Sequence, residues 1–298
     1  MFNIMRYYKF WFVFSVLLLL AGVVSLALYG LKPGIDFRGG TLTQISFEQA
    51  QDPAQIGEVL KSSGFAEASV QPLGDKSILI RTQPQDLQIH KNLLKALSDK
   101  YGQIKEDQYT SIGPVIGKEL RSGAFVQLIL VSLGIILYIA YAFRKVSKPV
   151  SSWRFGIAAI VALIHDLFIL VGAFSLLGHF WGVEIDSLFV TAVLTVLGFS
   201  VHDTIVVFDR IRENLRLRVG QNLSEIINNS INQTLIRSIN TSLTVIFVLT
   251  ALLLFGGESI HNFVLALLIG IVAGTYSSIF IASPILIVWH NWEVRRRS

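Results

Sequence analysis

Cysteine is absent from this chain of 298 residues, and charged residues are scarce. Without cysteine there is no disulfide, no thiol nucleophile and no cysteine-ligated metal. The absence of cysteine gives no indication of the redox compartment. Charged residues make up 15% of the chain, whereas about a quarter is usual in soluble domains. Apolar residues make up 52%, and the mean hydropathy is +0.59. The composition therefore indicates an integral membrane protein.

Six stretches are apolar and long enough to cross a bilayer, which takes about 20 residues of helix. A cleaved signal peptide is an alternative interpretation of the first stretch, because Arg6 and Lys9 precede it and Ser25 and Ala27 lie near its end. Its long apolar core and the five later stretches favour a first membrane helix. The predicted spans are 10–30, 123–143, 155–178, 185–208, 239–256 and 263–289.

The basic residues predict the orientation of these spans, because Lys and Arg gather on the cytoplasmic side. They occur at both termini and between spans 2 and 3 and spans 4 and 5, whereas loops 179–184 and 257–262 hold none. Both termini are therefore expected in the cytoplasm. This placement also accounts for the net charge of +5, and no nucleic-acid motif is present. The residues are Arg6, Lys9, Arg144, Lys145, Lys148, Arg154, Arg210, Arg212, Arg216, Arg218, Arg237, Arg295, Arg296 and Arg297.

Residues 32–120 form the predicted extracytoplasmic domain, in which basic and acidic residues balance as in a soluble protein. The alternation of side chains and the positions of Gly64, Gly74 and Gly102 indicate the order β-α-β-β-α-β, a ferredoxin-like α+β fold. The predicted elements are strands at 41–48, 67–73, 76–82 and 104–112, and helices from 53 to 64 and at 85–101.

The remaining parts are a first segment, 1–31, with the N-terminus and span 1, and a last segment, 121–298, with spans 2–6. The cytoplasmic connection 209–236 is amphipathic, and Asn222 with Glu225 resembles a capping box. We expect a helix here that lies along the membrane interface and leads into span 5.

Two carboxylates fall inside the apolar stretches, where ionisable groups are costly and often functional. Asp166 lies near the middle of span 3, and Asp203 lies in the cytoplasmic half of span 4. Each has an alternative interpretation as a buried group that hydrogen-bonds neighbouring helices and only locks their packing. For Asp166, His165 or a nearby Ser or Thr would suffice.

Neither carboxylate indicates a metal site or a protease. His165 and His202 directly precede the two Asp residues, and neighbours on a helix point about 100° apart, so neither pair chelates one ion. An intramembrane aspartic protease is a further alternative, but Ser200-Val201-His202-Asp203 lacks the Gly-x-Gly-Asp motif of that class. We expect no metal, no cofactor and no enzyme activity.

Small residues on span 6 predict close helix packing. Gly270 and Gly274 are four residues apart, and Ser277 and Ser278 follow. Packing within the chain and packing against a second six-helix bundle both explain this pattern.

Three motifs together resemble the SecF family, whose members are the smaller subunits of the bacterial SecD–SecF complex. The first is the glycine motif after span 1, with Gly34, Asp36, Phe37, Gly39 and Gly40. The second closes span 4 and runs from Val201 to Glu213, and the third opens span 5 and runs from Asn232 to Ser242.

The resemblance implies an inner-membrane protein of the resistance-nodulation-division superfamily. Such a subunit joins SecD and the SecYEG channel and uses a proton or sodium gradient to pull exported polypeptide after the SecA motor has pushed it. The family's intramembrane acid matches Asp203, and its arginine on span 5 matches Arg237. His202 stands where many members carry Asn, so a histidine is available to the proton relay. A second acid is expected in SecD.

The resemblance and the acid positions leave two alternatives open. One is half of another proton-driven exporter, for drugs or lipids. The other is a structural stabiliser of the channel, which would not need Asp203 to ionise. If Asp203 does ionise, burial favours its neutral form and an approaching Arg237 favours its charged form, so movement of Arg237 would switch the acid.

Overall fold

The computed structural model describes residues 3–143, 152–217 and 219–297. Arg144, Lys145, Lys148 and Arg218, which contributed to the predicted orientation, lie outside these ranges. The chain divides into two compact units. One consists of Met1–Lys32 with Gln127–Ser298, and the other is Pro33–Val126.

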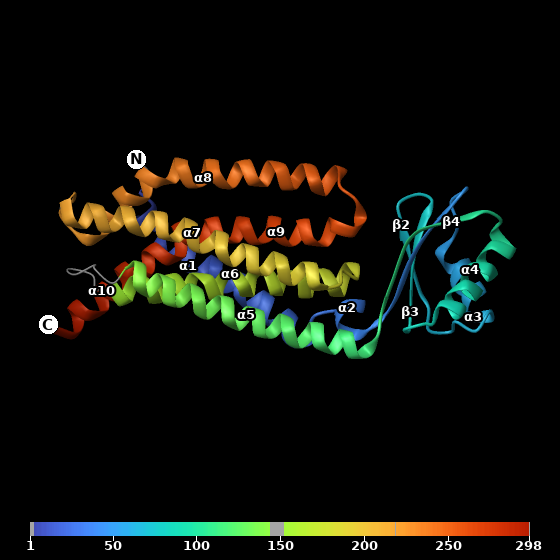
Figure 1. Ribbon diagram of the computed structural model, residues 1–298. Coiled ribbons are helices and arrows are strands. Elements are labelled where there is room, and N and C mark those ends of the chain that lie inside the picture. The colour runs from blue at the N-terminus through green and yellow to red at the C-terminus, as the bar shows by residue number, and fades with distance from the viewer. Residues whose placement is uncertain (1–2, 144–151, 218, 298) are drawn as a thin grey trace. The chain divides into compact units, whose positions relative to one another are not determined.

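The smaller unit contains one antiparallel sheet with strand order β2-β3-β1-β4. Helices α3 and α4 both cover the same face of the sheet (Figure 1). The predicted β-α-β-β-α-β order is confirmed, and a short helix, α2, precedes it. The elements are α2 (Ile35–Arg38), β1 (Gly40–Phe47), α3 (Pro53–Ser62), β2 (Ser69–Leu73), β3 (Ser77–Thr82), α4 (Leu87–Tyr101) and β4 (Ile104–Ile112).

Local sequence signals explain the limits of these elements. Asp52 caps α3 by accepting a hydrogen bond from the backbone N–H of Ala54, and Pro53 occupies the first helical turn. Gly102 ends α4 with φ +78°, a conformation that glycine adopts without strain. Alternate residues of β1 are buried against the helices, where Ile45 and Phe47 join a core made mainly of Leu and Ile.

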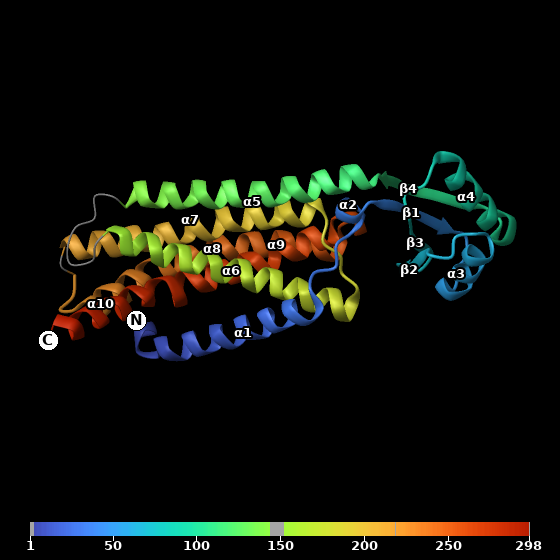
Figure 2. The ribbon, with the colours of Figure 1, turned by 90° about the horizontal axis from the view of Figure 1, so that it is seen from below.

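The larger unit holds helices that lie lengthwise beside one another (Figures 1 and 2). In the described ranges of the chain, six helices are long and apolar enough to cross a membrane, as predicted. They are α1 (Tyr8–Tyr29, after a 3-10 turn at Ile4–Tyr7), α5 (Pro114–Ala142), α6 (Ser152–Trp181), α7 (Ser187–Leu217), α8 (Leu223–Phe255) and a last span of three parts. Those parts are α9 (Glu258–Ser277), the π-helical turn η2 (Ser278–Ala282) and α10 (Ser283–Arg297).

Several helices continue beyond the apolar stretches that predicted them. The expected amphipathic helix is the first part of α8, which runs unbroken from Leu223 into the span because no Gly or Pro interrupts it. The predicted N-cap is present, since the Asn222 side chain accepts from the N–H of Glu225 at 2.9 Å. The return bond of a capping box is shifted by one residue, because the Glu225 side chain accepts from the N–H of Gln221 at 2.8 Å. The connection between α7 and α8 is therefore short.

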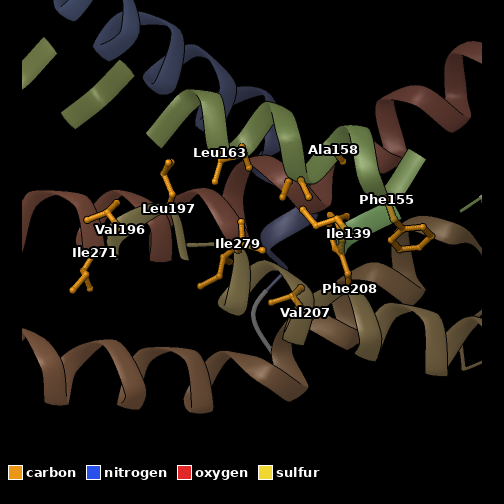
Figure 3. Packing of buried hydrophobic residues seen from close by; sticks show 14 of the residues in the cluster. Ile139, Phe155, Ala158, Leu163, Val196, Leu197, Val207, Phe208, Ile271 and Ile279 are labelled. Atoms are coloured by element: carbon orange, nitrogen blue, oxygen red, sulfur yellow. The ribbon is translucent and has the colours of Figure 1, made fainter. Parts of the chain in front are cut away.

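Apolar side chains from α5, α6, α7, α9 and η2 meet between the helices of the larger unit (Figure 3). Helix α1 packs differently, because its buried residues are the small Ser15, Gly22 and Ser25. Gly22 lies against Gly172 of α6 so closely that a Cβ on Gly22 would meet the Gly172 Cα at 3.2 Å. Small residues thus let α1 and α6 approach each other.

Candidate functional site

Asp203 is buried on α7, and only one of its two carboxyl oxygens is hydrogen-bonded. The Ser238 hydroxyl, on α8, donates to Asp203 Oδ1 at 2.6 Å. Oδ2 is buried and has no hydrogen-bond partner among the described residues. Buried polar atoms are nearly always paired, so an unpaired carboxyl oxygen within a membrane helix calls for a functional explanation.

Asp166, by contrast, is fully buried on α6 with both oxygens bound. Ser200 of α7 and Ser277 of α9 donate to Oδ2 at 2.5 and 2.7 Å. The Nδ1 atom of His165 lies 3.0 Å from Oδ1. The carboxylate of Asp166 therefore joins three helices. Its partners are a histidine and two serines, the residue types expected if Asp166 only locks helix packing.

Hydroxyl pairs extend this polar region between the helices. Thr204 of α7 pairs with Ser278 of η2 at 2.8 Å, and Ser242 of α8 pairs with Thr275 of α9 at 2.6 Å. These partners were not predicted individually. Their signal in the sequence is a four-residue spacing, seen for example between Ser238 and Ser242, which puts hydroxyls on one helix face.

Arg237 does not pair with Asp203. Its side chain is exposed on α8, and within the described ranges no ion pair joins the two residues. Instead Arg237 lines a cavity of about 410 Å³ together with Asp209, Arg210 and Glu213 of α7. The structure therefore brings Ser238, the next residue along the chain, to Asp203.

His202 lies on the exposed side of α7, whereas the adjacent Asp203 is buried. Thr191, Thr195 and Gly198 are exposed on the same helix at intervals of three or four residues, so the four form one stripe along it. This stripe is small and polar, which is unusual for a surface that faces lipid alone.

The glycine motif forms the junction between α2 and β1. The carbonyl of Gly34 accepts from the N–H groups of Phe37 and Arg38, both at 3.1 Å, so Asp36 and Phe37 lie within one short helical turn. Gly39 and Gly40 have φ of +76° and +144°. Only glycine takes up such conformations readily, so the motif shapes a turn.

Gly270 and Gly274 both face α7. A Cβ on Gly274 would meet the Ser200 Cβ at 2.9 Å, and one on Gly270 would overlap the Val196 side chain. These glycines therefore serve packing inside the chain. The described residues contain no group of three or more His, Asp or Glu able to hold a metal ion.

Residues 92–292 match the family model described as protein export membrane protein SecD/SecF, C-terminal, and residues 24–51 match the SecD/SecF GG motif. The chain belongs to the SecF family of protein translocase subunits. The protein translocase subunit SecF of Thermobaculum terrenum is 49% identical, over 99% of this chain and 96% of the relative. The SecDF protein of Bacillus subtilis is 34% identical, over 97% of this chain and 38% of the relative.

The crystal structure of SecDF from Thermus thermophilus superimposes with a TM-score of 0.85 at 34% identity, covering 97% of this chain. A structure of SecDF in a super-membrane-facing form gives a TM-score of 0.71 at 32% identity, covering 99% of this chain. This chain spans 39% and 40% of those two chains. The resemblance found in the sequence is thus confirmed for the family and the fold.

Proposed function

We propose that this chain is the SecF-type subunit of a complex with a SecD-type partner. The complex uses the proton or sodium gradient across the bacterial inner membrane to promote late steps of polypeptide export. Export itself runs through the SecYEG channel, and SecA supplies the initial push. The relay consists of Asp203 with Arg237, and Asp166 and His202 are the neighbouring groups available to it. In this proposal the subunit couples an ion gradient to polypeptide transport and is not a hydrolase by itself.

The half-satisfied carboxyl of Asp203 carries this proposal. Its Oδ1 is bound by Ser238, and its Oδ2 has no partner among the described residues. A carboxyl that only locks packing should have both oxygens bound, as in Asp166. A carboxyl that binds and releases an ion needs a free position. Asp203 fits the second description.

Arg237 supports the relay through its position. It directly precedes Ser238 on α8, and neighbours on a helix point about 100° apart. A rotation of α8 by about 100° about its axis would therefore exchange the hydroxyl at Asp203 for the guanidinium. The guanidinium favours the charged carboxylate, so its arrival would release a proton. In the present conformation Arg237 lines the cavity described above.

The polar stripe of α7 is the surface that we assign to the SecD-type partner. Thr191, Thr195, Gly198 and His202 are exposed in this chain. Both Thr hydroxyls donate to carbonyls of α7 itself, so the imidazole of His202 is the group that is expensive at a lipid surface. The SecDF relatives contain more than twice the length of this chain, which leaves room for a second bundle of helices. Such a partner would cover the stripe and bring the second acid close to Asp203.

The orientation also stays a proposal. The basic residues favour both termini in the cytoplasm and the smaller unit outside. An unfolded exported chain would then meet this unit as it leaves the channel. A drug or lipid exporter has no support from the relatives named above, which are translocase subunits.

The variant Asp203→Asn tests the relay, because it keeps the shape of the side chain but cannot ionise. We expect normal assembly with the SecD-type partner and ATP-driven export, with loss of the stimulation by the ion gradient. The matched control is Asp99→Asn, the same change at an exposed position of α4. If Asp203→Asn assembles and keeps full gradient-dependent export, the carboxyl is only structural.

A further inference from the structure

The last membrane span changes helix type part-way along its length. Helix α9 ends at Ser277, the π-helical turn η2 covers Ser278–Ala282, and α10 continues from Ser283. π-helical turns are rare and frequently occur at functional sites. Pro284 lies just beyond the turn, where its ring would clash with the carbonyl of Phe280 in a regular α-helix. The wider turn relieves this clash.

The two halves of this span differ in their side-chain partners, although Tyr276 of α9 also contacts α1, where its hydroxyl pairs with Ser15 at 2.9 Å. Gly270 and Gly274 of α9 pack against α7, and Thr275 bonds to Ser242 of α8. In α10, by contrast, Trp289 packs on Trp153 with ring centroids 4.7 Å apart, and Glu293 pairs with Arg154. Trp153 and Arg154 both belong to the first turn of α6. The π-helical turn is thus a joint between two attachments.

We distinguish two helix groups by these partners, and the groups also meet where Tyr276 of α9 contacts Trp11 of α1 and His165 of α6. The carrier group is α7, α8 and α9, and it contains Asp203 and Ser238. The support group is α6, α10 and α1. Within the support group α1 contacts α6 through Gly22 and Gly172, and Ser25 bonds to Ser175 at 2.9 Å. After α1 the chain leads into the smaller unit.

Asp166 links the two groups at the joint. It lies on α6, in the support group, and accepts hydrogen bonds from two residues of the carrier group. One of these, Ser277, is the last residue before the π-helical turn, and the other, Ser200, is one turn from Asp203 on α7. Its hydrogen bonds are therefore a polar link between the support group and the helix that carries Asp203, beside the contacts of Tyr276 with α1.

We propose that Asp166 is a positioning residue that holds the two helix groups in register, and that the π-helical turn absorbs their displacement when Asp166 loses its serine contacts. This inference rests on the proposed function in one respect: it names the helix groups that would move when Asp203 exchanges an ion. The link and the joint themselves do not depend on which ion Asp203 carries.

Spin labels on introduced cysteines test the proposal, since the chain has no cysteine of its own. One pair, at Val272 and Val288, lies across the π-helical turn, and a second pair, at Leu243 and Val272, lies within the carrier group. All three positions are exposed. Distances are measured by double electron–electron resonance on the purified full-length chain in lipid nanodiscs.

The double variant Ser200→Ala with Ser277→Ala removes both donors to Asp166 Oδ2. We expect a second distance population for the pair across the turn, because a change to α-helical register shifts α10 by about 1.5 Å and turns it by about 100°. The pair within the carrier group keeps its distribution. The matched control Ser242→Ala removes one hydroxyl bond within the carrier group, and we expect the original distribution for both pairs.

Two variants of Asp166 itself separate positioning from ion carriage. In Asp166→Asn the amide oxygen can still accept from both serines if the NH₂ group faces His165, so the second population should be small. Asp166→Ala cannot accept and should show it fully. If the double serine variant does not purify as a monodisperse protein, Ser277→Ala is measured alone. It should also show the second distance population across the turn.

An unchanged distribution across the turn in the serine variants would overturn the proposal, and so would an equal change in Ser242→Ala. Neither measurement involves export. A failure of the Asp203→Asn prediction would therefore leave the link and the joint standing. A rigid joint, in turn, would leave the relay at Asp203 untouched.

Discussion

Gly270 lies where α9 crosses α7, and alanine at this position would place a methyl group inside the side chain of Val196. A Cβ on Gly270 meets three side-chain carbons of Val196 at 3.0 Å or less, a separation that real Cβ atoms essentially never show. Val196 is β-branched and has one strongly preferred rotamer in a helix, so it cannot turn aside. The two helices must move apart instead.

The size of the effect follows from two opposing contributions. Overpacking of a tight core costs about 1–3 kcal/mol. Replacing glycine by alanine in a helix contributes about 0.5–1 kcal/mol in the other direction, because alanine loses less backbone entropy. Gly270→Ala should therefore lower the free energy of unfolding by about 0–2.5 kcal/mol, and it should be about 1–3 kcal/mol less stable than a Gly→Ala variant at an unpacked helix position. Gly134→Ala is the matched control, since a Cβ on Gly134 of α5 meets nothing within 4 Å.

Equilibrium unfolding of the purified protein in mixed micelles measures both variants. Gly134→Ala should be as stable as the unchanged protein or slightly more stable. Adding Val196→Ala to Gly270→Ala should restore part of the loss, and the double-mutant cycle isolates that coupling. Equal stability of Gly270→Ala and Gly134→Ala would refute the packing argument.

Three further predictions concern topology, the smaller unit and the relay. An impermeant thiol reagent on intact cells should label a cysteine at Gln88 but not one at Gln221, and the reverse pattern would end the proposed orientation. An excised fragment 36–116 should unfold cooperatively with mixed α/β circular dichroism and a stability of about 5 kcal/mol, whereas a disordered fragment would mean that its fold needs the spans. Arg237→Lys keeps the charge but loses the planar fork, so gradient-dependent export should be intermediate between the unchanged protein and Asp203→Asn. Export at the full level would show that charge alone suffices.

The sequence predicted the smaller unit well because its signals are local. Strand alternation, the Asp52 cap and terminal glycines fix each element, and the strands and helices found lie within a few residues of the predicted ranges. The six spans were equally clear from hydropathy. Their true lengths were not, because hydropathy reports the part of a helix that lipid surrounds and says nothing of polar turns beyond it, such as the end of α7 at Leu217.

The π-helical turn in the last span has little signal in the sequence. The residues Ser278–Ala282 are typical of an apolar α-helix, and Pro284 is the one nearby residue that indicates an irregular turn. A π-helical turn depends on how the two halves pack on α7 and on α6, which are tertiary contacts. The glycine and serine face of α1 was hidden for a similar reason, because Gly22 and Ser25 lie inside a long apolar run.

The sequence could name the two acids but could not tell them apart. Both are single carboxylates in apolar helices with a histidine just before them, and neighbours on a helix point in different directions. Only the packing shows that Ser200, Ser277 and His165 bind both oxygens of Asp166, whereas among the described residues Ser238 alone binds Asp203. The same limit explains why the sequence favours Arg237 as the neighbour of Asp203 and does not single out Ser238.

The difference between the acids supports the different roles that we propose for them. A fully bound carboxylate resists exchange of its partners and so suits a link between helices, whereas a half-bound one can gain or lose an ion with little rearrangement. Ser200 ties the two together, since it donates to Asp166 and lies one turn from Asp203 on α7. In the proposed relay, a change in α7 when Asp203 gains or loses an ion would therefore act on the Asp166 link, and through α6 on α1. The proposed gradient-driven function requires such a mechanical connection between Asp203 and the rest of the chain.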